Sequence, residues 1–244
     1  MERIEDIGFG GLKLIQESES FCYGIDAVIL ADFAYRTCSS FRTAVDLGTG
    51  NGIIPFILSS KNESAHFIGV ELQEEAVELA KRSCSLNDLG SRIEFVQSDV
   101  AELTPKTVGN REIDIVTCNP PYFPKGGGIP SSSSSKFIAR HETVASVDDF
   151  VKAAAVLLNG KGHFFMVHRT SRLVDIFCSC RRHVLEPKDV RFVVPRAGEL
   201  PNIVLIHCTA GGGKELHMMK ELCVYGPDGD GKYSDEIMKI YERI

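Results

Sequence analysis

The residues with the clearest capacity for chemistry form the run Asn119-Pro120-Pro121-Tyr122. The apolar run from Ile113 to Val116 precedes it and predicts a buried parallel strand, so Asn119 is expected at the carboxyl end of a strand, where open α/β sheets bind ligands. The two prolines remove two backbone donors, which leaves the Asn119 side chain and the nearby carbonyls as acceptors. Tyr122 and Phe123 add aromatic faces for stacking. The run therefore predicts a site for an amino group on an aromatic ring, with a surface turn as the alternative.

A second run, Asp46-Leu47-Gly48-Thr49-Gly50-Asn51-Gly52, lies between a predicted strand and a predicted helix. Glycine at alternate positions lets a ligand approach the backbone, and the free N–H groups of the following helix face that ligand. A dinucleotide fingerprint would require glycine at position 53, where this chain has Ile53. The Asp46 carboxylate would also repel a pyrophosphate. The run therefore favours a ligand with an amino acid tail.

Two further acidic residues follow predicted strands. Glu71 ends the strand from Ala65 to Val70, where a carboxylate accepts hydrogen bonds from the two hydroxyls of a ribose. Asp99 follows the strand from Ile93 to Gln97 and is expected to accept from an adenine amino group, with Val100 covering the ring. Helix capping is the alternative for each acid alone, but Asp46, Glu71 and Asp99 at three successive strand ends favour a nucleoside ligand.

The pattern around these motifs predicts an α/β fold. Residues 3–17 predict a β-hairpin with a glycine turn, and residues 27–35 predict a helix for which Asp26 is a candidate N-cap. Further helices are expected at 74–86, 147–158, 171–183 and 234–244. The last two strands, near 190–195 and 202–209, are joined without room for a helix and predict an antiparallel pair.

The chain of 244 residues is interpreted as a single domain spanning 1–244. Within it, residues 1–40 are expected to form the hairpin and first helix, and residues 41–244 the catalytic core. No stretch approaches the roughly 20 apolar residues of a membrane span and no targeting signal is recognised, so a cytoplasmic protein is expected, with no membrane partner. The eight cysteines lack metal-ligand spacing; buried free thiols and no metal site are expected.

The net charge of −6 argues, taken globally, against a nucleic-acid partner, but its distribution does not. Acidic residues dominate up to residue 120, and basic residues are in excess after it. The basic side chains of this second half are candidates for a phosphate-binding face, with ordinary solvated helix faces as the alternative: Arg140, Arg169, Arg172, Arg181, Arg182, Lys188, Arg191 and Arg196.

A glycine- and serine-rich stretch at residues 126–135 predicts a loop without an apolar pattern. The polar run after it contains Arg140 and His141, which are expected near the site. For His141, a substrate contact or a structural hydrogen bond is favoured over a role as general base.

Taken together, Asp46 to Gly52, Glu71, Asp99 and the Asn119 run resemble the ordered motifs of class I S-adenosylmethionine methyltransferases that modify exocyclic or amide nitrogens. Within that group, three runs are similar to the bacterial valine-tRNA adenine-N6 methyltransferases, in particular their Gram-positive branch: Tyr23 to Leu30, Thr117 to Phe123 and Ile138 to Glu142. The oligoserine stretch is less typical of that family.

This resemblance implies a doubly wound, mostly parallel seven-stranded sheet, S-adenosylmethionine as methyl donor, and tRNA as partner. The acceptor it implies is adenine 37 of valine tRNA, next to the anticodon on its 3′ side. The catalytic residues would be Asn119, Pro120, Pro121 and Tyr122. The cofactor would contact Tyr23, Asp26, Asp46, Leu47, Gly48, Thr49, Gly50, Asn51, Glu71, Leu72, Asp99, Val100 and Asn119. The substrate would contact Tyr122, Phe123, Arg140 and His141.

Two other functions remain open from the sequence. Protein-glutamine methyltransferases share the Asn-Pro-Pro-Tyr run, but they carry a helical substrate domain before the glycine run, for which only some 40 residues are available here. A binding module or oxidoreductase that merely holds a nucleotide cofactor is the other alternative; Ile53 and the complete Asn119 run argue against it.

Overall fold

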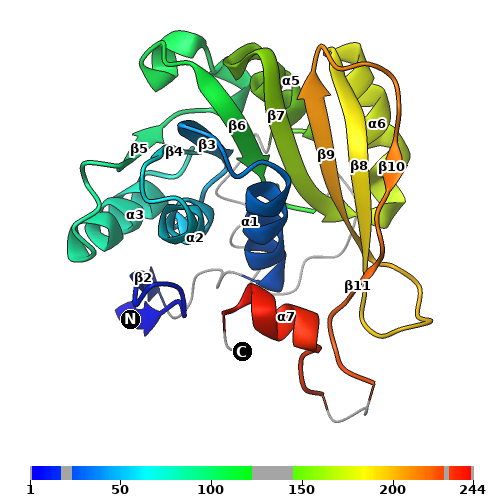
Figure 1. The fold of residues 1–244 in the computed structure, drawn as a ribbon. Helices are drawn as coiled ribbons and strands as arrows, with labels where there is room; N and C mark the ends of the chain where they lie inside the picture. The colour runs from blue at the N-terminus through cyan, green and yellow to red at the C-terminus, as the bar shows by residue number, and fades with distance from the viewer. Residues whose placement is uncertain (1, 18–23, 123–144, 228–230, 243–244) are drawn as a thin grey trace, which may run out of the picture.

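A mixed β-sheet forms the centre of the molecule (Figure 1). The computed structural model describes residues 2–17, 24–122, 145–227 and 231–242. Within these residues the sheet has nine strands in the order β10-β8-β9-β7-β6-β3-β4-β5, and β11 also pairs with β8. The strands are β3 (Thr43–Leu47), β4 (His66–Glu71), β5 (Ile93–Gln97), β6 (Ile113–Cys118), β7 (Leu158–Arg169), β8 (Leu185–Val194), β9 (Ile203–Ala210), β10 (His217–Met218) and β11 (Leu222–Cys223).

The pairing confirms a doubly wound, mostly parallel sheet. Strands β3 to β7 are paired in parallel, whereas β9 runs antiparallel to both β7 and β8, as expected for the last pair. The seven longer strands match the expected number. The strands β10 and β11, of two residues each, extend the edge beside β8 and have no alternating pattern that would predict them.

Helices cover both faces of the sheet (Figure 1). On one face lie α1 (Ile25–Thr37), α2 (Ile53–Lys61) and α3 (Glu74–Leu86), with α7 (Asp235–Ile240) beside α1. On the other lie α5 (Val147–Leu157), α6 (Leu173–Arg182) and the short 3-10 helices η1 (Val100–Glu102) and η2 (Pro105–Val108). Successive side chains of a strand point to opposite faces. Ala44 therefore belongs to the core cluster around α1 and α2, and Val45 to the cluster around α5 and α6.

The expected N-terminal hairpin is present as β1 (Glu2–Asp6) and β2 (Lys13–Glu17), paired antiparallel. The hairpin is fastened to α3 by polar groups. The backbone N–H of Ile15 donates to Ser83 Oγ at 2.9 Å, and the Asn87 side chain both accepts from Lys13 N and donates to Lys13 O.

Three local expectations differ from the structure. Helix α1 begins at Ile25 with Gly24 as its N-cap, so the proposed capping role of Asp26 is wrong. Helix α5 ends at Leu157 and not at the expected residue 158, because Leu158 already pairs with Ile113 in strand β7. Cysteines are not uniformly buried either, since Cys178 is exposed. The division of the domain at residue 40 stays a prediction.

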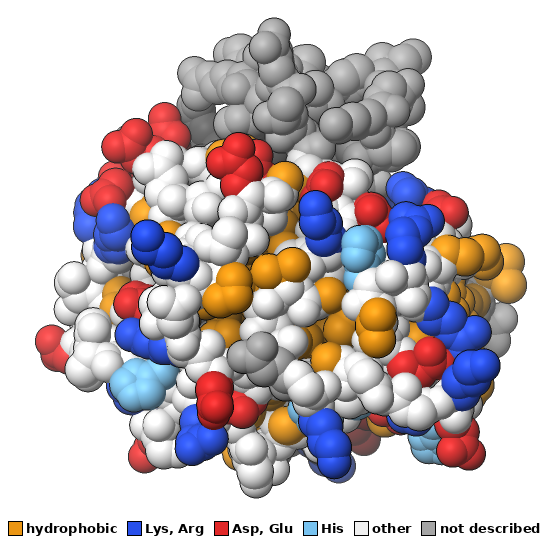
Figure 2. All heavy atoms as spheres, turned by 90° about the horizontal axis from the view of Figure 1, so that it is seen from above, with side chains coloured by type: hydrophobic (Ala, Val, Ile, Leu, Met, Phe, Trp, Pro, Cys, Tyr) orange, Lys and Arg blue, Asp and Glu red, His pale blue; other side chains and the backbone are white. Residues whose placement is uncertain are grey.

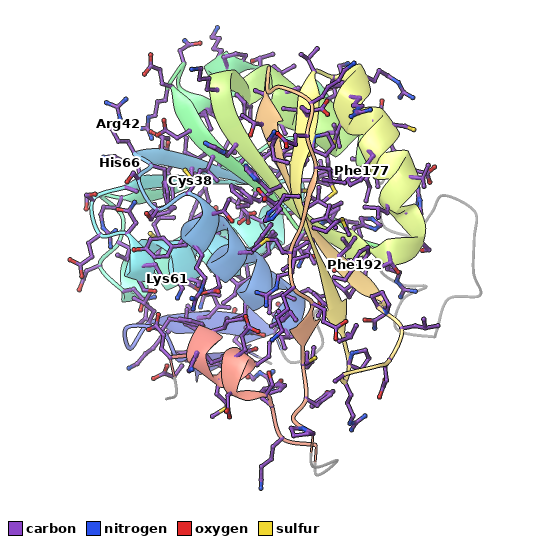
Figure 3. The ribbon with its side chains drawn as sticks, turned by 45° about the vertical axis from the view of Figure 1, so that its right-hand side comes forward. Cys38, Arg42, Lys61, His66, Phe177 and Phe192 are labelled. Atoms are coloured by element: carbon purple, nitrogen blue, oxygen red, sulfur yellow. The ribbon has the colours of Figure 1, made fainter. Side chains whose placement is uncertain are left out.

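The edge at which the parallel strands begin has a mixed surface. Arg42 and His66 mark the edge at which β3 and β4 begin (Figure 3). Figure 2, which views the molecule from the top of Figure 1, shows acidic, basic and hydrophobic side chains intermixed on that face.

No helix in the described part of the chain is long and apolar enough to cross a bilayer.

Candidate functional site

The carboxyl ends of β3 and β6 bring the two main sequence motifs together. These strands are neighbours, with Asp46 paired to Thr117 and Leu47 to Cys118. Asn119 directly follows β6, and the glycine turn directly follows β3. The chain continues from β3 to β4 on one side and from β6 to β7 on the other, which makes this the switch point where open α/β sheets bind ligands.

Tyr122 is fixed by contacts from three segments. Its hydroxyl donates to Asp26 Oδ2 at 2.6 Å and lies 3.2 Å from Asn119 Oδ1. Its ring centroid is 5.1 Å from that of His168 and 5.8 Å from the guanidinium carbon of Arg169. Burial and the Asp26 carboxylate raise the pKa of Tyr122 far above its usual range, so the hydroxyl stays protonated. The first turn of α1 and the end of β7 therefore hold the aromatic ring next to Asn119.

The glycine turn combines close packing with an open position. Gly48, Gly50 and Gly52 all have positive φ, a conformation in which side chains are strained. A Cβ on Gly52 would lie 2.6 Å from the Phe95 ring, so glycine there is needed for packing. A Cβ on Gly50 would meet no atom within 4 Å. Gly50 thus faces open space at the edge where a ligand is expected.

Glu71 connects this turn to the end of β4. Its Oε2 accepts from Gly50 N at 2.9 Å, and its Oε1 accepts from Leu72 N and Gln73 N at 2.8 and 3.0 Å. The side chain is only 8% exposed. Three backbone donors hold the carboxylate rigid, and Oε2 retains a lone pair for a further donor. The ribose contact expected of Glu71 stays a prediction, and the structure adds a role in shaping the turn.

Asp46 carries a buried oxygen without a partner. The residue is 3% exposed, and its Oδ1 accepts a 2.7 Å hydrogen bond from the Thr117 hydroxyl. Its Oδ2 is buried and has no hydrogen-bond partner among the described residues. Burial raises the pKa of Asp46 to about 7, against the opposing effect of the Thr117 and Thr49 hydroxyls. A buried unpaired carboxylate oxygen is costly, and a cationic group bound beside it would remove that cost.

The end of β5 supplies the third acid. Asp99 is half-buried, and its Oδ1 accepts from Ala101 N at 2.8 Å as the cap of η1, so the capping alternative holds for one of its oxygens. Val100 is buried next to it. Leu72, directly after β4, is 40% exposed. Because β4 and β5 are paired up to Glu71 and Gln97, these side chains share the edge that carries the glycine turn.

His168 is a site residue that the sequence reading did not assign. It is 1% exposed and ends the apolar run of β7. Its Nδ1 accepts from Arg169 N at 2.8 Å, whereas its Nε2 is buried and has no partner in the part of the chain that the structure describes. Burial and the nearby Arg172 and Arg169 charges lower the pKa of His168 to about 4, so the ring is neutral. The available signal was a histidine directly after the apolar run from Phe164 to Val167.

Four of the expected site residues lie outside the described residues: Tyr23, Phe123, Arg140 and His141. The same holds for the glycine- and serine-rich stretch at 126–135. Within the described residues, no group of three or more His, Cys, Asp or Glu side chains is placed to hold a metal ion.

Most of the arginines expected on a basic face are paired with acids. Arg172 contacts Asp175 and Arg181 contacts Glu186, at 2.7 and 2.6 Å. Arg182, Arg191 and Arg196 likewise contact acidic side chains. Arg169 is exposed and has no carboxylate partner among the described residues; its recorded side-chain contact is with the Tyr122 ring.

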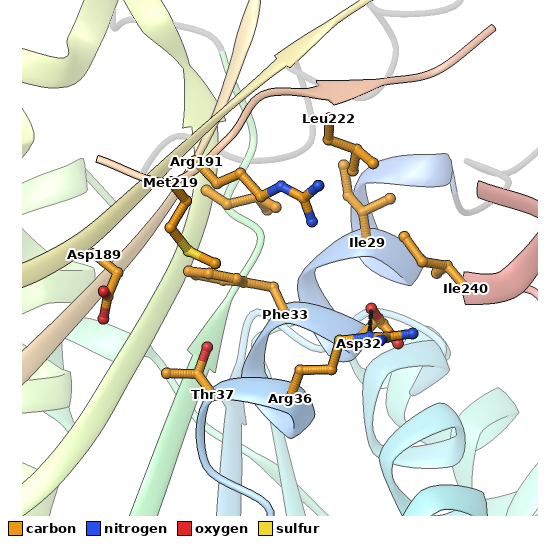
Figure 4. A pocket seen from close by; sticks show the side chains of 11 residues that line it. Ile29, Asp32, Phe33, Arg36, Thr37, Asp189, Arg191, Met219, Leu222 and Ile240 are labelled. Carbon is orange, nitrogen blue, oxygen red and sulfur yellow. Dashed lines mark hydrogen bonds and ion pairs between the residues drawn. The ribbon is translucent and has the colours of Figure 1, made fainter. Parts of the chain in front are cut away.

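A separate cavity of about 250 Å³ lies between α1 and the β8 edge of the sheet (Figure 4). Its charged groups already have partners: Arg36 contacts Asp32 at 2.6 Å, and Arg191 donates to the Lys220 carbonyl and to Glu236. None of the residues expected to be catalytic or to bind the cofactor lines it, and of the candidates for a phosphate-binding face only Arg191 does. The candidate site is therefore the edge at the carboxyl ends of β3, β4, β5 and β6.

A mostly parallel sheet flanked by helices, with a glycine turn after β3 and an Asn-Pro-Pro-Tyr turn after β6, defines a Rossmann-like methyltransferase fold. Residues 26–175 match the model of the methyltransferase small domain, and the chain belongs to this family.

Relatives and solved structures agree with this assignment. The chain is 28% identical to the tRNA1(Val) (adenine(37)-N6)-methyltransferase of Histophilus somni, over 98% of this chain and 97% of that protein. It is 24% identical to the protein of the same name from Aeromonas hydrophila, covering 89% and 87%. A predicted O-methyltransferase from Agrobacterium tumefaciens has a similar structure, with a TM-score of 0.71 at 20% identity over 89% and 96%. TrmN from Thermus thermophilus gives 0.54 at 20% identity, covering 75% and 48%.

Proposed function

We propose that this protein transfers a methyl group from S-adenosylmethionine to the exocyclic N6 of an adenine in tRNA, and that the acceptor is adenine 37 of valine tRNA. The observation that carries the proposal is the position of Asn119 at the end of β6, beside the glycine turn of β3. The names of the Histophilus and Aeromonas relatives support the choice of acceptor. A tRNA substrate fits the cytoplasmic location expected from the sequence.

The edge offers complementary groups for each part of the cofactor. The unpartnered Asp46 oxygen suits the ammonium group of the methionine tail, and the open backbone at Gly50 leaves room beside it. Glu71 suits the ribose hydroxyls. Asp99, Leu72 and Val100 suit the adenine, with one carboxylate for its amino group and two apolar side chains for its faces. When bound there, S-adenosylmethionine supplies a methyl group on a positively charged sulfur.

The residues of the Asn119 turn would prepare the acceptor nitrogen. The lone pair of an exocyclic amino group is delocalised into its ring, so the nitrogen must become pyramidal to react. The Asn119 side-chain oxygen and the Pro120 carbonyl would each accept one N–H, which orients the lone pair and stabilises the positive charge that develops on nitrogen. No strong base is needed, because the proton becomes acidic only after the nitrogen has attacked, and water can then take it.

Tyr122 would hold the base. An adenine in a single-stranded loop can be turned outward at a cost of a few kcal/mol, and stacking on an aromatic ring returns about 1–3 kcal/mol. The hydrogen bond to Asp26 fixes the plane of the Tyr122 ring before the base arrives. The expected contacts of Phe123, Arg140 and His141 with the RNA stay part of this proposal.

The proposal is tested by the acceptor of the methyl group. The protein is incubated with labelled S-adenosylmethionine and valine tRNA, and the RNA is digested for nucleoside mass spectrometry. N6-methyladenosine at position 37 is expected, and it should be absent from a transcript with guanosine at that position. Release factor serves as the parallel acceptor. Label on a glutamine of release factor, with none on tRNA, would overturn the proposed function.

A further inference from the structure

The hydroxyl of Tyr122 lies between two oxygen atoms, 2.6 Å from Asp26 Oδ2 and 3.2 Å from Asn119 Oδ1. A phenol has one proton and donates one hydrogen bond. The carboxylate takes this proton, because its contact is shorter and hydrogen bonds to charged acceptors are stronger. The raised pKa of Tyr122 agrees with a phenol that keeps its proton.

The contact between Tyr122 and Asn119 then joins two oxygens with no proton between them. A half-turn of the amide about its Cβ–Cγ bond exchanges oxygen and nitrogen with almost no change in shape. In that orientation Nδ2 of Asn119 donates to the phenol oxygen, and Oδ1 takes the position of Nδ2. No hydrogen bond is recorded for Nδ2 within the described residues, so the amide oxygen would be free for a substrate there.

We propose that Asp26 and the Tyr122 hydroxyl act as positioning groups that set the orientation of the Asn119 amide. Asp26 holds the phenol proton, the phenol oxygen accepts from Asn119 Nδ2, and Asn119 Oδ1 faces the amino group to be methylated. The inference rests on the proposed function. It gives the first turn of α1 a part in the reaction, although Asp26 is 96 residues from Tyr122 in the chain.

Three variants distinguish this role from a merely structural one. Tyr122→Phe keeps the ring and removes the hydroxyl, so neither amide orientation is favoured. With the two orientations equally populated, half of the molecules are productive, so kcat should fall about 2-fold, with little change in KM for tRNA. Asp26→Asn keeps an acceptor oxygen and should retain most of kcat.

Asp26→Ala should be more harmful than Tyr122→Phe. Without the carboxylate, the phenol proton turns to Asn119 Oδ1 and holds the amide in the unproductive orientation. Adding Tyr122→Phe removes that proton, so the double variant should recover to the kcat of Tyr122→Phe alone. Two independent structural losses would instead multiply, and the double variant would be the slowest.

Controls separate this role from helix stability and cofactor binding. Asp235→Ala removes an acid from the first turn of α7 and should leave kcat unchanged. Thermal unfolding and calorimetric binding of a cofactor analogue are measured for every variant. The positioning role would be overturned if the kcat losses of Asp26→Ala and Tyr122→Phe multiplied in the double variant. It would also be overturned if Asp26→Ala bound the cofactor more weakly but had a normal kcat at saturating cofactor. The methyl acceptor of the wild-type protein is identified in a separate experiment. If another acceptor were found, the proposed function would be wrong, but the order of the kcat values would still decide the role of Asp26.

Discussion

In the proposed function, Asn119 would make a contact that strengthens as positive charge develops on the acceptor nitrogen. Asn119→Ala is therefore expected to lower kcat by about 100-fold or more while leaving cofactor affinity unchanged. Steady-state kinetics on valine tRNA, together with calorimetry for the cofactor, measures both quantities. Near-normal turnover of this variant would remove Asn119 from the reaction.

The buried Asp46 carboxyl should make cofactor binding depend on pH. Burial raises the pKa of Asp46 to about 7, so the group is largely neutral below this pH and gains its charge above it. An ionised Asp46 attracts the ammonium of the cofactor, whose own amino group titrates near pH 8. Affinity should therefore rise from pH 6 to about 7.5 and fall above pH 8. Calorimetry on Asp46→Asn should show no rise; the same rise in this variant would assign the titration to another group.

The same raised pKa affects folding in the absence of cofactor. An acid whose pKa is raised by folding favours the folded state at low pH and loses this contribution as pH rises through the folded value. The contribution of Asp46 to stability is thus fully present below about pH 4 and is lost as pH approaches 7. Asp46→Asn should flatten this part of the stability curve.

The sequence predicted which motifs meet, but not the contacts between distant side chains. Asn119, Glu71 and Asp99 follow strands whose apolar runs are plain, and the carboxyl ends of parallel strands share one edge. The pair Asp26 and Tyr122 is different: it depends on how α1 packs on the sheet, which periodicity alone does not fix. His168 was not predicted for a similar reason: only the fold shows which buried strand end lies next to the site.

At the scale of elements, the turn between β3 and α2 has one glycine needed for packing, Gly52, and one that faces the expected ligand, Gly50. Gly50→Ala and Gly52→Ala each place a side chain at positive φ, at a cost of about 1–2 kcal/mol. Gly52→Ala also overlaps the Phe95 ring, so it should destabilise the fold by a further 1–3 kcal/mol or so. The Gly50 side chain would enter open space, and this variant should chiefly lose cofactor affinity. Urea unfolding and calorimetry on both variants would contradict this division if the two behaved alike.

Glu71 joins that turn to β4, so its loss should have two effects. Glu71→Ala removes the acceptor of three backbone N–H groups and the expected partner of the ribose. Cofactor binding should weaken by roughly 1–3 kcal/mol, with a measurable loss of unfolding free energy as well. Glu78→Ala, on the exposed face of α3, is the matched control. Unchanged cofactor affinity in Glu71→Ala would refute the ribose assignment.

For the whole molecule, the capacity to bind RNA depends more on which basic side chains are paired with acids than on the net charge. The net charge of −6 and the excess of bases after residue 120 gave opposite indications about RNA. The structure shows why neither sum is decisive: five arginines of the second half are matched with acidic side chains. Three of these pairs join separate elements, as between Arg182 of α6 and Asp148 of α5, and could not be read from composition.

Among the described arginines of that set, Arg169 is the exception, and we expect it to contact RNA. It is exposed at the end of β7, lacks a carboxylate partner among the described residues, and lies 5.8 Å from the Tyr122 ring. A nucleotide whose base stacks on Tyr122 would bring its phosphate within reach of this guanidinium. Arg169→Ala should weaken tRNA binding roughly tenfold at low salt, as for one lost charged contact.

The salt dependence of tRNA binding distinguishes the loss of a phosphate contact from a change in the shape of the site. Each phosphate contact to a single strand contributes about −0.7 to the slope of log K against log salt, so Arg169→Ala should make the slope shallower by about that amount. Arg181→Ala is the control, because Arg181 is also exposed but is paired with Glu186 of β8, and its slope should match the wild type. Binding is measured by fluorescence titration from 50 to 200 mM salt with a catalytically silent cofactor analogue. A weakened complex with an unchanged slope would assign Arg169 to holding the Tyr122 ring instead of the RNA backbone.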